Sequence, residues 1–464
     1  MAGMSNHVMV KATESEGEDG SIADDEKPQL PETAHPSFAE AFRFWLKLGF
    51  ISFGGPTGQI AIMHQELVDR KKWVSNERFL NALNYCMLLP GPEAQQLAIY
   101  IGWLLHEIPG GVVAGAFFVI PSIFVLLGLS YVYAAYGNVP WIASIFDGLK
   151  PAVMAIVAAA VIRIGKKALK NEVMVAIAAA AFTAIFFFKV PFPVIVLSAG
   201  LVGLAGGMVL PEKFHVVRKE GDGDGRDGYV TICTDPDTCH INPSMRQNVL
   251  VVTVFVLLWL VPSMLLYLYA AAPTFFTEAV FFTKAAFLTF GGAYAVLPYI
   301  AQAGVEQYSW LTAEQMIDGL GLAETTPGPL IMVVQFVGFM AGWNHPGALS
   351  SVMGATIGSL VATYFTFLPC FLFIFLGAPY IEKFRGNVRL STTLSGITAA
   401  VVGVVLNLAV WFGMHVLFAS KGRVNWFGAL VGLASFIALQ WTRLGIISVI
   451  LLSGGLGLAW HLVF

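Results

Sequence analysis

A pattern of glycine and proline occurs twice inside apolar segments of this chain. Phe-Gly-Gly at 53–55 and Pro-Gly-Pro at 90–92 both recur 237 residues later, at 290–292 and 327–329. Lys47, Gln65, Trp73 and Glu77 also recur in the same register. An ungapped match of this kind predicts a duplicated unit. A membrane tolerates such helix breaks mainly where the backbone lines a cavity or is buried in protein.

Apolar runs recur along most of the length, and many reach the roughly 20 residues that a helix needs to cross a bilayer. The chain is 57% hydrophobic and only 12% charged, about half the charged fraction of a soluble protein. The sequence therefore predicts an all-α polytopic membrane protein in the lipid bilayer. Its two homologous helical repeats are expected to contain broken helices and to be inverted.

The apolar pattern divides the chain into five parts. Residues 1–37 form an acidic N-terminal tail with few apolar side chains, which predicts disorder. The first transmembrane repeat covers 38–211, and a polar cytoplasmic loop follows at 212–246. A linker transmembrane helix is expected at 247–271, and the second transmembrane repeat covers 272–464.

Basic residues in short loops indicate the orientation. The loop that holds Arg163 and Lys167 is predicted to be cytoplasmic, and counting apolar segments then gives thirteen spans with the N-terminus inside. The lone helix at 247–271 makes the two halves inverted. Some basic residues disagree with this count because they fall in outer loops, so a first segment that is re-entrant, or a miscounted span, stays open. These residues are Arg70, Lys71, Lys72, Arg78, Lys421 and Arg423.

The Pro-Gly-Pro elements each end one helix and start another. In the first half the restarted helix begins after Pro90, Gly91 and Pro92. Its free N–H groups and positive dipole end attract anions. In the second half the hydroxyls of Thr325 and Thr326 add donors ahead of Pro327, Gly328 and Pro329. Kinks for packing alone are the alternative, but two matched kinks favour a binding site for a transported ion.

The Gly-Gly elements allow two interpretations. Ser52, Gly54 and Gly55 in the first half, and Gly291 and Gly292 in the second, fit an unwound stretch of backbone beside a ligand. They also fit a close helix crossing through small residues.

Two lysines and two glutamates are charged candidates within apolar segments. Lys47 and Lys284 could contact an anionic substrate, or could extend to the membrane interface. Glu93 and Glu324 lie beside the Pro-Gly-Pro elements. A carboxylate there could couple proton binding to anion binding, or could cap its own helix start.

Amide side chains near the breaks are further candidates. Gln59, Gln95, Gln96 and Gln335 can donate hydrogen bonds to oxyanion oxygens. Asn81, Asn84 and Asn407 could equally join neighbouring helices.

The four cysteines predict no cofactor and no metal centre. Cys86 and Cys370 lie in apolar segments and fit small core residues. Cys233 and Cys239 lie near His240, but their spacing matches no common zinc pattern, which favours two solvated loop thiols.

These motifs together resemble the chromate ion transporter family, often called CHR, in its long two-domain form. Ser-Phe-Gly-Gly-Pro at 52–56 is followed by Gln-Ile-Ala at 59–61. Leu-Pro-Gly-Pro at 89–92 is followed by Glu-Ala-Gln-Gln-Leu at 93–97, and Gly-Leu-Lys-Pro-Ala stands at 148–152. The resemblance covers about residues 38–463.

The resemblance implies proton-driven antiport of chromate out of the bacterial cytoplasm, across the inner (plasma) membrane, with chromate resistance as the result. The second half reads Phe-Gly-Gly-Ala, and its Pro-Gly-Pro lacks the following Glu-Ala-Gln-Gln. We therefore expect the first half to carry the substrate and proton chemistry, and the second half to act as a gate.

Rival functions share this sequence pattern. Sulfate and molybdate have chromate's charge and shape, so a pocket of donors discriminates poorly among them. Import and passive conduction by an anion channel stay open, as does a homodimer. A chromate-reducing enzyme would need a redox centre, which scattered Cys and His do not predict. No nucleotide-binding motif is present, and no nucleic-acid partner is expected.

Overall fold

The computed structural model describes residues 35–463 except Gly54, Arg443 and the segments 215–244, 270–272, 381–387 and 419–423. These residues form helices without a strand, and seven of the described helices are long and apolar enough to cross a membrane. The acidic tail and the loop at 212–246 lie almost wholly outside the described residues, as do Cys233, Cys239, Lys421 and Arg423.

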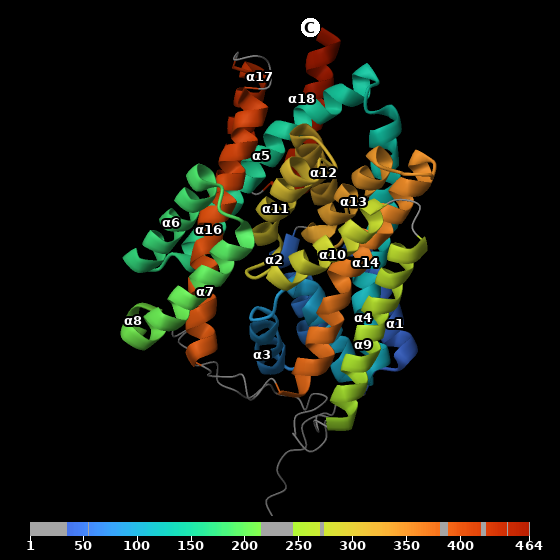
Figure 1. Ribbon diagram of the computed structural model, residues 1–464, viewed down its shortest axis with the longest axis vertical. Coiled ribbons are helices and arrows are strands. Elements are labelled where there is room, and N and C mark those ends of the chain that lie inside the picture. Colours follow the sequence, from blue (N-terminus) through green and yellow to red (C-terminus); the bar gives the residue numbers. More distant parts are fainter. Residues whose placement is uncertain are drawn as a thin grey trace, which may run out of the picture.

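The helices of the two halves follow one another in the same order (Figure 1). The first half comprises α1 (Phe38–Ile51), α2 (Gly55–His64), the π-helix η1 (Gln65–Arg70), α3 (Asn76–Cys86), α4 (Glu93–Tyr136), α5 (Pro140–Ala168), α6 (Glu172–Phe188), α7 (Phe192–Val209) and α8 (Pro211–Phe214). After α9 (Met245–Tyr269), the second half comprises α10 (Pro273–Leu288), α11 (Ala293–Ala301), the π-helix η2 (Gln302–Gln307), α12 (Ala313–Thr325), the 3-10 helix η3 (Leu330–Met332), α13 (Val333–Asn344), α14 (Ser351–Gly377), the 3-10 helix η4 (Ala378–Tyr380), α16 (Val388–Leu417), α17 (Trp426–Trp441) and α18 (Ile446–Val463).

The duplication extends to local structure. The π-helices η1 and η2 begin 237 residues apart. Phe44 and Phe281 are separated by the same number of residues. The ring of Phe44 lies 5.5 Å from that of Trp73 at 77°, and the rings of Phe281 and Trp310 have the same distance and angle. The repeated motifs therefore fold in the same way in both halves.

The helix α4 is a hairpin of two arms rather than one rod. His106 and Glu107 have non-helical backbone angles, with φ of −143° and 52°. Beyond them the chain returns along the first arm, so that the side chain of Gln95 donates to the carbonyl oxygen of Gly115 at 3.4 Å. In the second half α13 and α14 pack against each other in the same way through Gly338 and Gly358.

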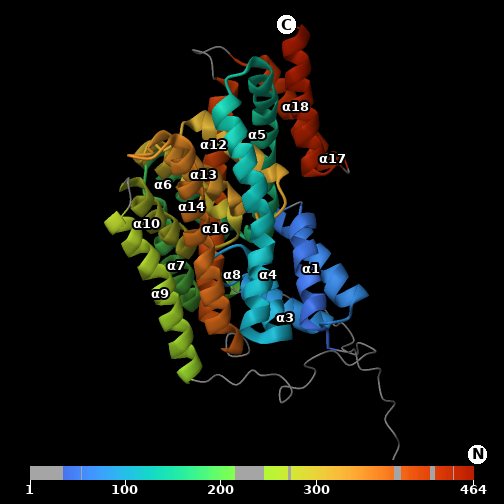
Figure 2. The same cartoon turned by 90° about the vertical axis from the view of Figure 1, so that its right-hand side faces the viewer.

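The first two apolar segments counted as spans, near 38–56 and 79–105, belong to hairpins that enter and leave at the same end of the molecule. Lys71, after η1, pairs with Glu40 at the start of α1 at 3.1 Å. The ring of Phe38 lies 5.4 Å from that of His106, at the turn of α4. Because α1 has 14 residues, it is about 21 Å long and too short for a hydrocarbon core of about 30 Å. Figure 2 shows α1 and α3 confined to the lower half of the molecule.

The matching segments of the second half also form hairpins. Asn344 donates to the carbonyl oxygen of Trp310 at 2.8 Å, and Nε2 of His345 lies 3.1 Å from the carbonyl oxygen of Ser309. Helix α12 lies in the upper part of Figure 1, and α3 in the lower part. Four segments expected to span the membrane are therefore hairpins. The first hairpin places the basic residues after η1 at the end of the molecule where α1 begins.

The long helices α5 and α16 run antiparallel. A Cβ on Gly165 would lie 3.7 Å from Val402, whereas one on Gly413 would lie 4.0 Å from Met154. Helices α6 and α7 pack mainly on α16, and α17 and α18 pack mainly on α5. The outer helices of each half therefore pack against the long helix of the other half.

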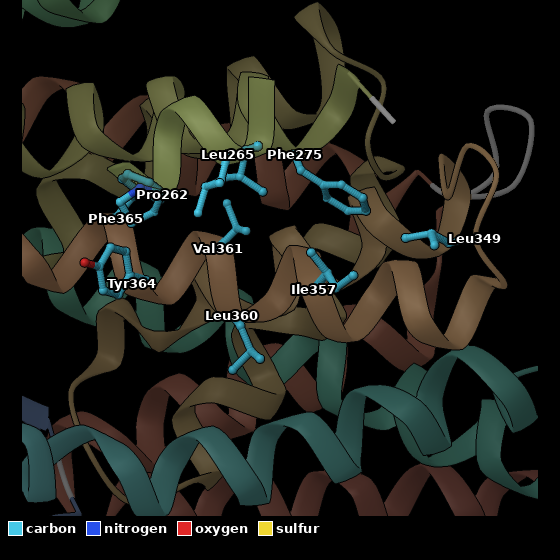
Figure 3. Close-up of a pocket in the computed structure, with 10 residues that line it drawn as sticks. Pro262, Leu265, Phe275, Leu349, Ile357, Leu360, Val361, Tyr364 and Phe365 are labelled. Carbon is cyan, nitrogen blue, oxygen red and sulfur yellow. The ribbon is translucent and has the colours of Figure 1, made fainter. Parts of the chain in front are cut away.

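Helix α9 stands at the edge of the molecule beside α10 and α14 (Figure 1). Between them lies a groove of about 610 Å³, which Figure 3 shows lined by side chains such as Leu265, Phe275, Leu360 and Phe365. Its lining carries no charged group. The hydroxyl of Tyr364, which also lines the groove, donates to the carbonyl oxygen of Leu258 at 2.7 Å, so the groove suits lipid chains better than an anion.

Candidate functional site

The breaks of the two halves meet and exchange backbone hydrogen bonds. The N–H of Gly328 donates to the carbonyl oxygen of Ser52 at 2.8 Å. The N–H of Gly91 donates to the carbonyl oxygen of Thr289, also at 2.8 Å. Both bonds join a Pro-Gly-Pro of one half to the residue before Phe-Gly-Gly of the other half. Such a reciprocal pair is the pattern of contacts across a two-fold axis.

The Pro-Gly-Pro breaks need glycine at their centre. Gly91 has a φ of 125° and Gly328 a φ of 99°, a region that side-chain-bearing residues rarely adopt. A Cβ on Gly91 would lie 3.0 Å from Sγ of Cys370, and one on Gly328 would lie 2.6 Å from Oγ of Ser122. The flanking prolines have no N–H, so the glycine is the only backbone donor within each motif.

The Phe-Gly-Gly elements are unwound stretches, not continuous helices that cross closely. The hydroxyl of Ser52 donates to the carbonyl oxygen of Leu48 at 2.6 Å, which closes the end of α1. Thr289 does the same to Ala285 at 2.6 Å at the end of α10. Helices α2 and α11 then begin at Gly55 and after Gly292, with Gly291 in the intervening turn. Gly54 lies outside the described residues.

Buried amide side chains hold the breaks from within the first half. Nε2 of Gln59 donates to the carbonyl oxygens of Ser52 at 3.2 Å and of Gly328 at 2.6 Å. Nε2 of Gln96 donates to Pro90 at 2.7 Å. The Oε1 atoms of Gln59, Gln95 and Gln96 are buried without a partner among the described residues. The amide nitrogens of these glutamines thus bond to the backbone, whereas their oxygens accept no hydrogen bond from the described residues.

Ser122 and Cys370 are contact residues that the sequence reasoning missed. The hydroxyl of Ser122 donates to the carbonyl oxygen of Pro327, in the other half, and Cys370 lies at Gly91. A signal for this pairing exists in the chain, since Pro121-Ser122 and Pro369-Cys370 occupy corresponding places in the two halves. Cys370 is buried as expected, but it is in contact with the break of the first half.

Each of the two glutamates contacts the first turn of α11. A Cβ on Gly292 would lie 3.7 Å from Oε1 of Glu93. The hydroxyl of Tyr294 donates to Oε1 of Glu324 at 2.6 Å. Two carboxyls from opposite halves therefore flank one helix N-terminus. The charge of Lys167 acts on Glu93, and the charge of Arg163 acts on Glu324.

The remaining predicted residues have other surroundings. The hydroxyls of Thr325 and Thr326 donate to carbonyl oxygens of their own helix at 2.7 and 2.9 Å. Lys47 and Lys284 are exposed on α1 and α10, more than one turn before the breaks. Gln335 is buried and donates to the carbonyl oxygen of Ile123 at 2.8 Å.

Comparison with known proteins gives consistent matches. The model of the family described as "Chromate transporter" matches residues 39–204 and 276–458, one region in each half. A "Probable chromate transport protein" of Synechococcus elongatus is 29% identical, over 82% of this chain and 86% of its own. A "Chromate transport protein" of Cupriavidus metallidurans is 30% identical, over 78% and 79% respectively.

A "Chromate transport protein" of Pseudomonas aeruginosa is also 30% identical, over 80% of this chain and 79% of its own. No solved structure matches the chain. Both halves match the family model, and the helical architecture with its paired breaks fits a polytopic membrane protein. The chain belongs to the chromate transporter family.

Proposed function

We propose that this chain is a secondary transporter that exports chromate from the bacterial cytoplasm, across the inner membrane, in exchange for protons. The observation that carries the proposal is the reciprocal pair of bonds between Gly91 and Thr289 and between Gly328 and Ser52. Through these bonds four broken helices meet inside an apolar protein. Broken helices that meet in this way form the ion and substrate sites of many secondary transporters.

Anion chemistry follows from the direction of these helices. Helices α2, α4 and α11 all begin at the breaks, with Gly55, Glu93 and Ala293 as their first residues. The first N–H groups of a helix have no partner within it, and its dipole makes that end positive. Backbone donors of this kind suit a tetrahedral oxyanion. The names of the related proteins favour chromate over sulfate or molybdate.

We further propose that the two halves are inverted in the membrane. Helices α5 and α16 are equivalent, because Ala-Ile-Val-Ala at 155–158 corresponds to Ala-Val-Val-Gly at 400–403. They run antiparallel in contact with each other. The basic end of α5 would face the cytoplasm together with the start of α1, in keeping with the excess of basic residues on that side.

Proton coupling is assigned to Glu93 and Glu324. An ionised carboxylate at the start of α11 stands where an anionic substrate would bind, so it repels that substrate by charge. Protonation removes this repulsion. The occupancies of proton and anion are therefore linked at this site.

Flux into proteoliposomes tests the proposal. Chromate uptake is measured with the vesicle lumen acidic, with the bath acidic, and with no pH gradient, while the membrane potential is held at zero. Exchange with protons predicts uptake driven by an acidic lumen, and cotransport predicts uptake driven by an acidic bath. Equal flux in all three conditions would indicate a channel, and labelled sulfate and molybdate in parallel would establish the substrate class.

Three variants then assign the roles of the halves. Glu93→Gln and Gln96→Ala are expected to reduce chromate flux, because they change the first half's site. Thr326→Ala is the comparison, since its hydroxyl bonds only to its own helix among the described residues. Full flux in the first two variants, with loss in Thr326→Ala, would overturn the division of labour.

A further inference from the structure

A buried carboxyl lies in α12, away from the breaks and in contact with the other half of the protein. Asp318 is only 4% exposed. The hydroxyl of Tyr133, at the far end of α4, donates to its Oδ2 at 2.9 Å. The ring of Tyr133 is held between Phe146 and Phe336, at centroid distances of 4.8 and 5.3 Å. The donor is therefore fixed in position.

A row of charged groups leads from this carboxyl to the surface. Lys150, on α5, has a side chain that is 20% exposed, and its ammonium group bonds to Asp147 at 2.9 Å. The side chain of Asp147 is 65% exposed. The charge of Lys150 also acts on Asp318. Exposure thus falls stepwise from Asp147 through Lys150 to Asp318.

Two oxygens at the inner end of this row lack a partner among the described residues. One is Oδ1 of Asp318, and the other is the hydroxyl of Ser130, which is fully buried. Ser130 precedes Tyr133 by one helical turn and so lies on the same face of α4. A buried polar atom without a partner is destabilising, so each of these oxygens indicates a place for a proton or a water that carries one.

We propose that Asp318 is a proton-binding residue, loaded from the surface at Asp147 and Lys150 and positioned by Tyr133. This inference rests on the proposed proton coupling and adds a second site to it. A proton from solvent binds Oδ1 of Asp318 and converts the carboxylate to the acid, and no other bond changes. The ammonium of Lys150 balances the carboxylate when the proton leaves.

The titratable groups around Asp318 come from three elements. Glu314 lies one turn earlier on α12, Asp147 and Lys150 lie on α5, and Tyr133 lies on α4. Gly321 and Thr325 follow Asp318 at helical spacing, and Thr325 stands at the break of the second half. Val153 would lie 3.0 Å from a Cβ on Gly321, so packed side chains separate Asp318 from the break in this conformation.

Infrared difference spectroscopy of the full-length protein in lipid tests proton binding directly. A pH step is applied, and the carbonyl stretch of the carboxylic acid is recorded. Asp318→Asn should remove one component of this band. Glu278→Gln is the matched control, because Glu278 is fully buried on α10 and no residue of the proposed row lies on that helix. It should leave the component from Asp318 in place. An unchanged band in Asp318→Asn would overturn the proposal.

Transport then tests coupling. Asp318→Asn should lower uptake driven by a pH gradient by about tenfold or more, and should keep exchange of labelled for unlabelled chromate without a gradient. Asp318→Glu should restore part of the driven uptake. Equal losses of driven uptake and exchange would indicate a structural role and refute the inference. If the wild type carries no oxyanion, the proposed function fails, and the infrared band still decides whether Asp318 binds a proton.

Discussion

A single backbone N–H in each half joins the two halves at their breaks. Gly91 and Gly328 donate these bonds, and both adopt a positive φ beside a side chain of the other half. Ser122 donates a hydroxyl to the break of the second half, whereas Cys370, at the break of the first half, bonds weakly to its own helix at 3.9 Å. Gln59, from the first half, donates a further bond to the carbonyl oxygen of Gly328. Among the described residues, the second-half break therefore has more hydrogen bonds to the opposite half than the first-half break has.

Replacing Gly328 by alanine is expected to reduce both stability and transport. The new Cβ would strain a backbone with a φ of 99° and would meet Ser122, at a cost of about 1–3 kcal/mol. The measurement is thermal unfolding in detergent together with chromate flux. Gly128→Ala is the control, because a Cβ there meets nothing within 4 Å and gains about 0.5–1 kcal/mol of helix stability. Equal unfolding temperatures and equal chromate flux in the two variants would show that the break tolerates a side chain.

At the scale of helices, the sequence located the breaks but not the direction of the chain after them. Glycine and proline fix where a helix ends, because their backbone limits are local. Whether an apolar helix of 14 residues crosses or returns depends on distant partners, such as the pair of Glu40 with Lys71. The same holds for the site. Gly91 and Gly328 were predictable, whereas the contacts of Ser122 and Asp318 join residues far apart in the chain.

Close helix contacts explain some glycines outside the breaks. A Cβ on Gly148, in α5, would clash with the carbonyl oxygen of Ser453 in α18. Gly148→Ala must therefore push the two helices apart, which costs about 1–3 kcal/mol. Gly165→Ala on the same helix is the control, since its nearest neighbour lies at 3.7 Å. The thermal unfolding temperature should fall in Gly148→Ala alone. A similar fall in both variants would contradict the close contact between α5 and α18.

At the scale of the molecule, each half completes the other. Helices α6 and α7 cover α16, helices α17 and α18 cover α5, and the breaks exchange their bonds. A movement of one half's long helix would carry the outer helices of the other half with it. The lone helix α9 connects the halves and lies at the edge, where it makes few of these contacts (Figure 1).

The sidedness of the hairpins gives a decisive test of this arrangement. Arg70 and Gln307 end the two π-helices, 237 residues apart, and both are exposed. Hairpins in inverted halves predict that cysteine at position 70 reacts from the cytoplasm and cysteine at 307 from outside. Thirteen straight spans predict the reverse. The reason is that each hairpin returns its chain to the side from which it entered.

Arg70→Cys and Gln307→Cys are made in a chain whose loop residues Cys233 and Cys239 are serine, since Cys86 and Cys370 are buried. A membrane-impermeant maleimide is applied to intact cells and to inside-out vesicles, and a permeant maleimide shows that both sites can react. Labelling of position 307 in cells and of position 70 in vesicles is expected. Labelling of both positions from one side would contradict inverted halves, and labelling in the reverse sense would replace the hairpins by straight spans.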